Sequence, residues 1–141
     1  MSALAIGLLK KGCSVSGSDL VKNDETKKLE ELGAVIFTSQ IRQNIEFIIS
    51  KFTNKMINFV VSSAIKAENE EFSYCRENNL SIKHRSEILA MLMRTYNALA
   101  VAGSHGKTST STFLSTILEL CTRNSSSITG GIILFTTLIV I

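Results

Sequence analysis

The sequence predicts an α/β fold in which a parallel sheet is covered by helices on both faces and is followed by a phosphate-binding loop. Two observations support this prediction. Short apolar runs alternate with longer segments of helical periodicity through the first 97 residues, which is the pattern of strand–helix–strand units. Farther along, the stretch ALAVAGSHGKTSTSTFLSTILEL at residues 98–120 joins an apolar run, a glycine loop and a helical segment.

Helices are predicted where apolar residues recur at helical spacing between capping and stop signals. In residues 1–11, Leu4 and Leu8 share one face, two lysines follow, and Gly12 is the expected stop. In residues 86–94, Ser86 provides a capping-box-like start. The other predicted helices are residues 23–32, opened by Asn23 or Asp24 and closed by Gly33, residues 40–55, residues 69–78, and the segment after Gly106.

Strands are predicted in the apolar runs between these helices, at residues 13–18, 34–37, 58–62, 81–83 and 98–102. In parallel sheets, ligands bind at the carboxyl ends of the strands. Ser18 ends the first run and Asp19 follows it, at a place where an acidic residue often binds ribose hydroxyls; the alternative is an aspartate that caps a turn. Ser63 follows the third run, either near a ligand or in a plain exit from the strand. His84, ahead of a helix, is interpreted as a structural hydrogen-bonding group rather than a catalyst.

Composition narrows the class of protein. The chain has 141 residues, 45% of them hydrophobic, and a net charge of +3, which fits one domain or one domain plus a fragment. The lysines are scattered, so no nucleic-acid partner is expected. The three cysteines form no metal-binding spacing and indicate free thiols in a reducing cytoplasm. No signal peptide is recognised, and the apolar run at residues 132–141 is too short to span a bilayer, so no membrane partner is expected.

The glycine loop holds the strongest candidate site. Gly103 and Gly106 let the backbone approach a ligand closely, and amides at the start of the following helix favour an anion. Lys107 would place its ammonium on the outer phosphates of a nucleotide, and Thr108 would complete the coordination of Mg²⁺. Val101 stands where the full P-loop pattern has a glycine. The alternative is a glycine-rich turn with a capping threonine and no ligand.

Residues 100–109, AVAGSHGKTS, resemble the ATP loop of the Mur ligases, which build the peptide of bacterial cell-wall precursors and carry the shorter GxxGK[ST] form. Further motifs extend the resemblance through about Gly131: MSALA at the start, VSGSD at residues 15–19, VVSSAI at residues 60–65 and HRSEILAMLMR at residues 84–94. Within the family, these motifs are most similar to the branch that joins L-alanine to UDP-N-acetylmuramate.

The resemblance implies an ATP-dependent, amide-forming ligase of the cytoplasm. Its substrates would be UDP-N-acetylmuramate and L-alanine, and its cofactors ATP and Mg²⁺. Residues 1–97 would form a Rossmann-like domain for the UDP substrate, with Ser18, Asp19 and Ser63 near the UDP part. Residues 98–141 would begin a P-loop ATPase domain. There, Lys107 would be the catalytic residue that stabilises the transferring phosphoryl charge, Thr108 would ligate Mg²⁺, and the remaining ATP contacts would be Gly103, Ser104, His105, Gly106 and Ser109.

The chain also departs from the family pattern. The family's glycine loop, GxGGxGM, should end at Met1, so the resemblance implies that this loop and the first strand of the Rossmann-like domain are missing, and with them part of the UDP site. The family's acidic metal motif and C-terminal domain should follow residue 141. The tail LFTTLIVI at residues 134–141 is unlike the family and suggests truncation or a frame shift, and residues 46–55 are expected to loop out as an insertion. We therefore expect an inactive fragment. Two alternatives stay open: a ligase that reattaches recycled cell-wall peptide to UDP-muramate, and a stand-alone nucleotide-binding module.

Overall fold

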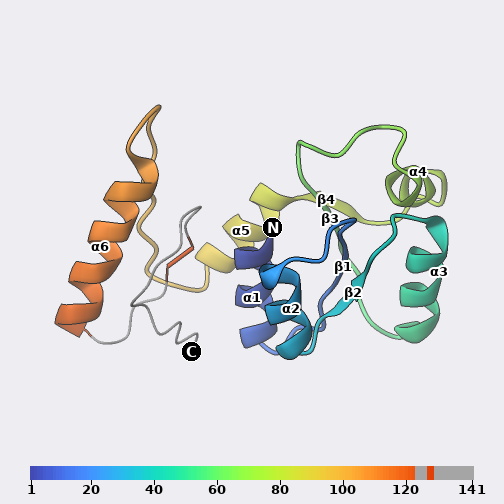
Figure 1. Ribbon diagram of the computed structural model, residues 1–141, viewed down its shortest axis with the longest axis horizontal. Helices are drawn as coiled ribbons and strands as arrows, with labels where there is room; N and C mark the ends of the chain where they lie inside the picture. Colours follow the sequence, from blue (N-terminus) through green and yellow to red (C-terminus); the bar gives the residue numbers. More distant parts are fainter. Residues whose placement is uncertain (123–126, 129–141) are drawn as a thin grey trace.

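The computed structural model describes residues 1–122 and 127–128, and it has the alternating helix–strand order that the sequence predicts (Figure 1). The predicted tail at residues 134–141 lies outside the described residues. The elements are α1 (Ser2–Lys10), β1 (Ser16–Ser18), α2 (Asp24–Glu31), β2 (Val35–Phe37), α3 (Arg42–Lys51), β3 (Phe59–Val61), α4 (Glu70–Glu77), β4 (Ile82–His84), α5 (Arg85–Met93) and α6 (Lys107–Thr122).

The strands are parallel, as predicted, but they form two separate ladders. β1 pairs with β2 in a register that places Gly17 opposite Ile36, and β3 pairs with β4 in a register that places Val60 opposite Lys83. Among the described residues no ladder joins β1 to β3, so the expected continuous sheet is instead two pairs of strands. Each ladder is closed over one helix, α2 or α4, as a βαβ unit requires.

The helices lie on two sides of the strands. Figure 1 shows α1, α2 and α5 on one side and α3 and α4 on the other. Contacts between α1 and α2 and between α3 and α4 agree with this arrangement. The core is small, and its apolar members come from both sides: Leu4, Leu29, Ala34, Ile48, Cys75 and Ile88.

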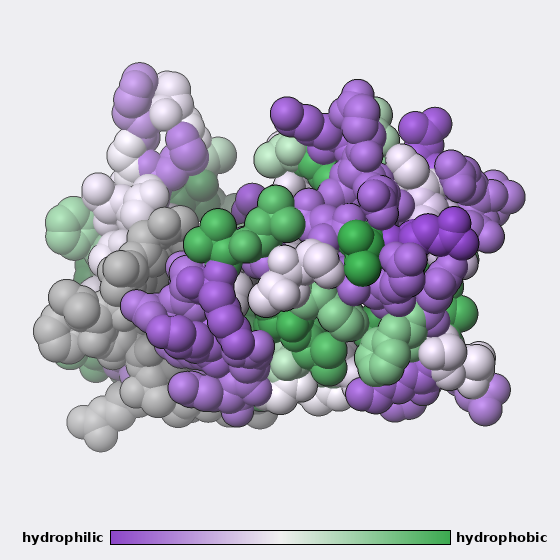
Figure 2. Space-filling model, turned by 45° about the vertical axis from the view of Figure 1, so that its right-hand side comes forward, coloured by the Kyte–Doolittle hydropathy of each residue, from purple (hydrophilic) through white to green (hydrophobic). Residues whose placement is uncertain are grey.

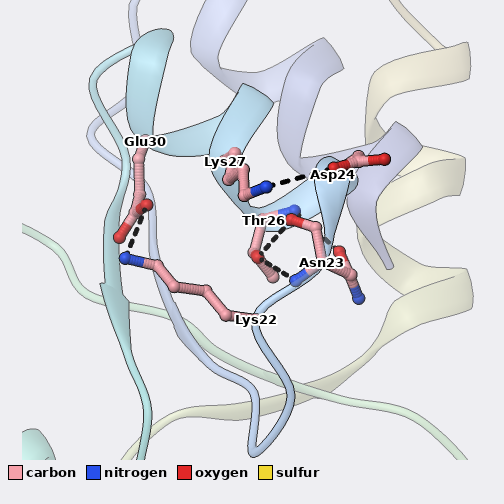
Figure 3. Close-up of polar contacts among 6 residues, drawn as sticks. All are labelled: Lys22, Asn23, Asp24, Thr26, Lys27 and Glu30. Carbon is pink, nitrogen blue, oxygen red and sulfur yellow. Dashed lines mark hydrogen bonds and ion pairs between the residues drawn. The ribbon is translucent and has the colours of Figure 1, made fainter.

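Helix α2 is capped at its N-terminus by Asn23, one of the two residues that the sequence offered for this role. The Asn23 side chain accepts a hydrogen bond from the Thr26 amide, and the Thr26 hydroxyl accepts one from the Asn23 amide, each at 2.9 Å (Figure 3). This reciprocal pair satisfies two amides at the helix start that have no partner within the helix. At the other end Gly33 has a φ of +92°, a conformation that glycine adopts without steric cost.

Two sequence-based expectations about helices need correction. Residues 46–51 do not loop out, because α3 continues through Lys51, with Ile48 buried and the Phe37 and Phe47 rings in edge-to-face contact at 6.0 Å. Helix α5 is capped by His84 rather than by Ser86. A capping box needs a polar acceptor three residues after the cap, which is Glu87 for His84 but the apolar Leu89 for Ser86.

The prediction of a strand at residues 98–102 is also wrong, because the structure has no strand there. These residues pair with none of the four described strands, and Leu99 is 67% exposed. A parallel strand is held by hydrogen bonds to a neighbour, so an apolar run without one does not form a strand. Helix α6 follows as predicted, with Phe113, Ile117 and Leu120 each more than half exposed.

Apolar side chains are therefore only partly covered by this chain. On the face drawn in Figure 2, apolar residues remain visible in several clusters between polar ones. The exposed large apolar residues of the chain include Leu20, Val21 and Met56, in addition to those of α6.

Candidate functional site: the glycine loop before α6

The glycine loop wraps around the side chain of its own lysine. Lys107 is the first residue of α6, and its Nζ donates hydrogen bonds to the carbonyl oxygens of Gly103 at 2.6 Å and Ser104 at 2.9 Å. The ammonium therefore lies inside the loop, beside the start of the helix. Gly106 has a φ of +72°, which turns the chain from the loop into α6.

The loop suits a phosphate group on two grounds. The first hydrogen bond of α6 runs from the Thr110 amide to the Gly106 carbonyl at 2.9 Å, so the amides of residues 107–109 precede the helix ladder and have no acceptor within it. Amides of this kind, together with the helix dipole and an ammonium, bind anions. Residues 102–110 are all exposed, so a ligand can reach them. Ser104, His105, Thr108 and Ser109 belong to this accessible stretch.

Two of the residues predicted for the UDP part, Ser18 and Asp19, make hydrogen bonds at the carboxyl end of β1. The Ser18 hydroxyl donates to Glu71 Oε2 at 2.6 Å, which ties the end of β1 to the first turn of α4. Asp19 Oδ1 accepts the Val21 amide at 3.0 Å, so Asp19 caps a turn, the alternative that the sequence left open. One carboxylate oxygen of Asp19 is used in this way.

Ser63 and His84 lie at the ends of the second strand pair. Ser63 is exposed just after β3, and the neighbouring Ser62 hydroxyl accepts the Ala64 amide at 3.4 Å. His84 Nδ1 lies 2.7 Å from the Ser86 hydroxyl, and the His84 amide donates to Glu87 at 2.6 Å. His84 is thus a helix cap, which confirms its structural interpretation. Figure 1 places the glycine loop apart from both β1 and β3.

The sequence did not reveal the polar junction around Glu71. Glu71 Oε1 accepts a hydrogen bond from Asn44 Nδ2 at 2.7 Å, and that nitrogen also donates to the Ser39 carbonyl at 2.7 Å. Asn44 is buried, so these contacts satisfy its amide. The signal that could have identified Asn44 is a polar residue on the apolar face of α3, although its partner is distant in the chain.

Cys75 lies one turn farther along α4, facing the core. Burial of the thiol, with the Glu71 carboxylate nearby, raises its pKa from 9.0 to about 11. The thiol is therefore protonated at neutral pH, while Cys13 and Cys121 are exposed. The described cysteines are free, in agreement with their predicted state.

Neither a protein-based metal centre nor a membrane-spanning helix is found in the part of the chain that the structure describes. No group of three or more His, Cys, Asp or Glu residues there could hold a metal ion. No helix there has the length and apolar character needed to cross a bilayer.

Comparison with known proteins identifies the family. The profile of the Mur ligase family, catalytic domain, matches residues 1–97. The chain belongs to the Mur ligase family. Among curated Mur ligases, a UDP-N-acetylmuramate--L-alanine ligase of Prochlorococcus marinus subsp. pastoris is 70% identical over 133 residues, which are 94% of this chain and 28% of that protein.

Other Mur ligases show the same pattern of coverage. A protein of the same name from Prochlorococcus marinus strain NATL1A is 47% identical over 133 residues, and one from Trichormus variabilis is 40% identical over 147 residues. They are covered by this chain over 27% and 30% of their lengths, respectively. The chain thus spans less than a third of the length of these relatives.

Proposed function

We propose that this chain is part of an ATP-dependent ligase that joins L-alanine to UDP-N-acetylmuramate, and that residues 103–109 are its ATP loop. The observation that carries the proposal is the Lys107 ammonium, held inside the glycine loop by the Gly103 and Ser104 carbonyls at the start of α6. The name of the relatives specifies the substrates and favours this reaction over the recycling of cell-wall peptide.

Each loop residue has a part in this proposal. ATP would supply the phosphoryl group that activates the muramate carboxylate. Lys107 would leave the loop carbonyls and neutralise phosphate charge, and the amides at the start of α6 would bind phosphate oxygens. The Thr108 hydroxyl would help to hold Mg²⁺. Gly103, Ser104, His105, Gly106 and Ser109 would shape the rest of the loop.

The remaining residues and domains follow the same proposal. Residues 1–97 would bind the UDP end of the substrate through Ser18, Asp19 and Ser63, and residues 98–141 would begin a P-loop ATPase domain. Ser18 and Asp19 support this by their place at the carboxyl end of a parallel strand, where ligands bind in such sheets. We place the enzyme in the cytoplasm. The chain by itself would lack ligase activity, because most of the length of its relatives is not included in it.

Calorimetric titration of the full chain with Mg-ATP tests the ATP loop. We expect binding by the unmodified chain and at least tenfold weaker binding by Lys107→Ala, since the ammonium is the only side-chain cation that the described structure places inside the loop. Lys66→Ala, which removes an exposed lysine outside the loop, is the matched control and should bind as the unmodified chain does. Equal affinities of Lys107→Ala and the unmodified chain would overturn the assignment.

A separate assay tests the expected inactivity. Phosphate release from ATP is measured with and without L-alanine in the presence of UDP-N-acetylmuramate. We expect no alanine-dependent release by this chain. ATP binding without such release would also fit a nucleotide-binding module, whereas release that requires alanine would show that the chain contains a complete ligase site.

A further inference from the structure

Glu71 sets the direction of the hydrogen bond at the carboxyl end of β1. A carboxylate only accepts hydrogen bonds, so the hydrogen between Ser18 Oγ and Glu71 Oε2, which lie 2.6 Å apart, comes from the Ser18 hydroxyl. That hydroxyl has a single hydrogen, and this contact uses it. Toward a ligand, the Ser18 side chain therefore presents lone pairs, which accept hydrogen bonds and cannot donate them.

The buried Asn44 holds Glu71 in this role from the other side. Glu71 Oε1 accepts a hydrogen bond from Asn44 Nδ2 at 2.7 Å, and the same nitrogen donates to the Ser39 carbonyl at 2.7 Å. Both partners of this nitrogen are acceptors, so the Asn44 amide presents its NH₂ group to them and not its oxygen. The Asn44 contact thus needs an acceptor at Oε1 and leaves Oε2 for Ser18.

Asp19 adds another acceptor at the same end of β1. Its amide donates to the Phe37 carbonyl at 3.0 Å, and its Oδ1 accepts the Val21 amide. Asp19 Oδ2 makes no hydrogen bond or ion pair with the described residues, and Asp19 is exposed. The side chains of Ser18 and Asp19 therefore both offer acceptors to a ligand.

Acceptors of this kind select a ligand group that donates. A sugar hydroxyl or the N–H of a base can donate to Ser18 Oγ. A phosphate oxygen instead brings lone pairs and negative charge, which the carboxylates of Asp19 and Glu71 repel. The nearest lysine in the sequence, Lys22, is paired with Glu30 at 3.3 Å. The end of β1 thus suits the nucleoside part of a UDP substrate better than its diphosphate.

We propose that Glu71 is a positioning residue that makes Ser18 a hydrogen-bond acceptor, and that Ser18 thereby binds a neutral donor of the nucleoside, a ribose hydroxyl or the base N–H. Glu71 acts through Ser18 and does not itself contact the ligand. The inference rests on the proposed function, in which residues 1–97 bind the UDP end of the substrate.

The substitution Glu71→Gln tests this role, because it reverses the contact and keeps its shape. The new carbonyl oxygen would face Asn44 Nδ2, and the new NH₂ group would donate to Ser18 Oγ. The Ser18 hydroxyl would then turn its hydrogen toward the donor of the ligand. In calorimetric titrations of the full chain with UDP, we expect Glu71→Gln to bind about five- to tenfold more weakly than the unmodified chain.

The Ser18→Ala background separates positioning from a general effect on the fold. Without the hydroxyl, Glu71→Gln has nothing to reverse, so its addition to Ser18→Ala should not weaken UDP binding further. Circular dichroism at the titration temperature checks that each variant is folded. Glu77→Gln, at an exposed position of the same helix, is the matched control and should bind UDP as the unmodified chain does.

A series of ligands identifies the donor on the unmodified chain, without any substitution. One UDP analogue lacks the ribose hydroxyls, and another carries a methyl group on the base nitrogen. The analogue that has lost the donor should bind more weakly than UDP, and Glu71→Gln should not weaken its binding further. Inorganic pyrophosphate should leave the NMR amide signals of Ser18 and Asp19 unshifted, whereas UDP should shift them.

The results distinguish this inference from the proposed function. Absence of UDP binding by the unmodified chain would overturn the proposed UDP site and the inference with it. UDP binding that Glu71→Gln leaves unchanged, or weakens equally with and without the Ser18 hydroxyl, would overturn the inference alone. A shift of the Ser18 signal by pyrophosphate, or full-strength binding of both analogues, would also overturn the inference alone.

Discussion

The Ser18 hydroxyl lies 2.6 Å from Glu71 Oε2, although the two residues are 53 positions apart in the chain. Through this contact and the one between Glu71 and Asn44, a single carboxylate links β1, α3 and α4. The junction connects the first strand pair to the helix that spans the second, and we expect it to stabilise their relative placement.

Replacement of Glu71 should therefore destabilise the chain. Glu71→Ala leaves the buried Asn44 amide and the Ser18 hydroxyl without this acceptor, at a cost of about 1–3 kcal/mol. Glu71→Gln should cost less, because it retains one carbonyl acceptor. Urea unfolding followed by circular dichroism measures both. Glu77→Ala, on an exposed position of the same helix, is the control, and equal effects of Glu71→Ala and Glu77→Ala would contradict the role of the junction.

The raised pKa of Cys75 predicts a loss of stability in alkali. The folded state favours the neutral thiol, so the free energy of unfolding includes a contribution that is complete below pH 9.0 and declines as the pH rises toward about 11. Urea unfolding of the unmodified chain and of Cys75→Ala between pH 7.5 and pH 11 measures it. The stability of the unmodified chain should fall more steeply, and parallel curves would refute the prediction. Alkylation at pH 8 should also modify the exposed Cys13 before Cys75.

The capping box of α2 should contribute measurably to stability. Asn23→Ala removes the acceptor for the Thr26 amide, which we expect to lower the free energy of unfolding by about 0.5–2 kcal/mol. Thermal unfolding provides the measurement. Lys27→Ala is the matched control, since it removes only an exposed ion pair with Asp24 at 3.3 Å and should cost less than about 0.5 kcal/mol. A larger effect at Lys27 than at Asn23 would count against the prediction.

Substitution by alanine should have different effects at the two glycines of the loop. Gly106 has a left-handed conformation, so Gly106→Ala should strain the start of α6 by about 1–2 kcal/mol and accelerate hydrogen exchange at the Thr110 amide. A Cβ on Gly103 would lie 3.5 Å from the His105 carbonyl oxygen, which is an ordinary contact. Gly103→Ala should therefore leave Thr110 exchange unchanged, and equal acceleration by both substitutions would disprove the difference.

Local signals in the sequence predicted the elements well. Asn23 and Gly33 mark the ends of α2, and Asn69 caps α4, because caps and stops act within a few residues. The glycine loop was likewise predicted from contiguous residues. The sequence did not reveal features that depend on distant parts of the chain. The contact of Ser18 with Glu71 joins segments that are far apart in the sequence. Residues 98–102 form no strand because they pair with none of the described strands.

The split of the sheet into two ladders has a consequence for folding kinetics. Each ladder closes over one helix, so both β1–β2 and β3–β4 form through contacts that are local in sequence and carry a small loop-closure entropy. The Ser18–Glu71 contact joins segments that are farther apart and is expected to form after both ladders. During synthesis, the segment from β1 to β2 emerges from the ribosome before the segment from β3 to β4, and it can form its hydrogen bonds before β4 has been made.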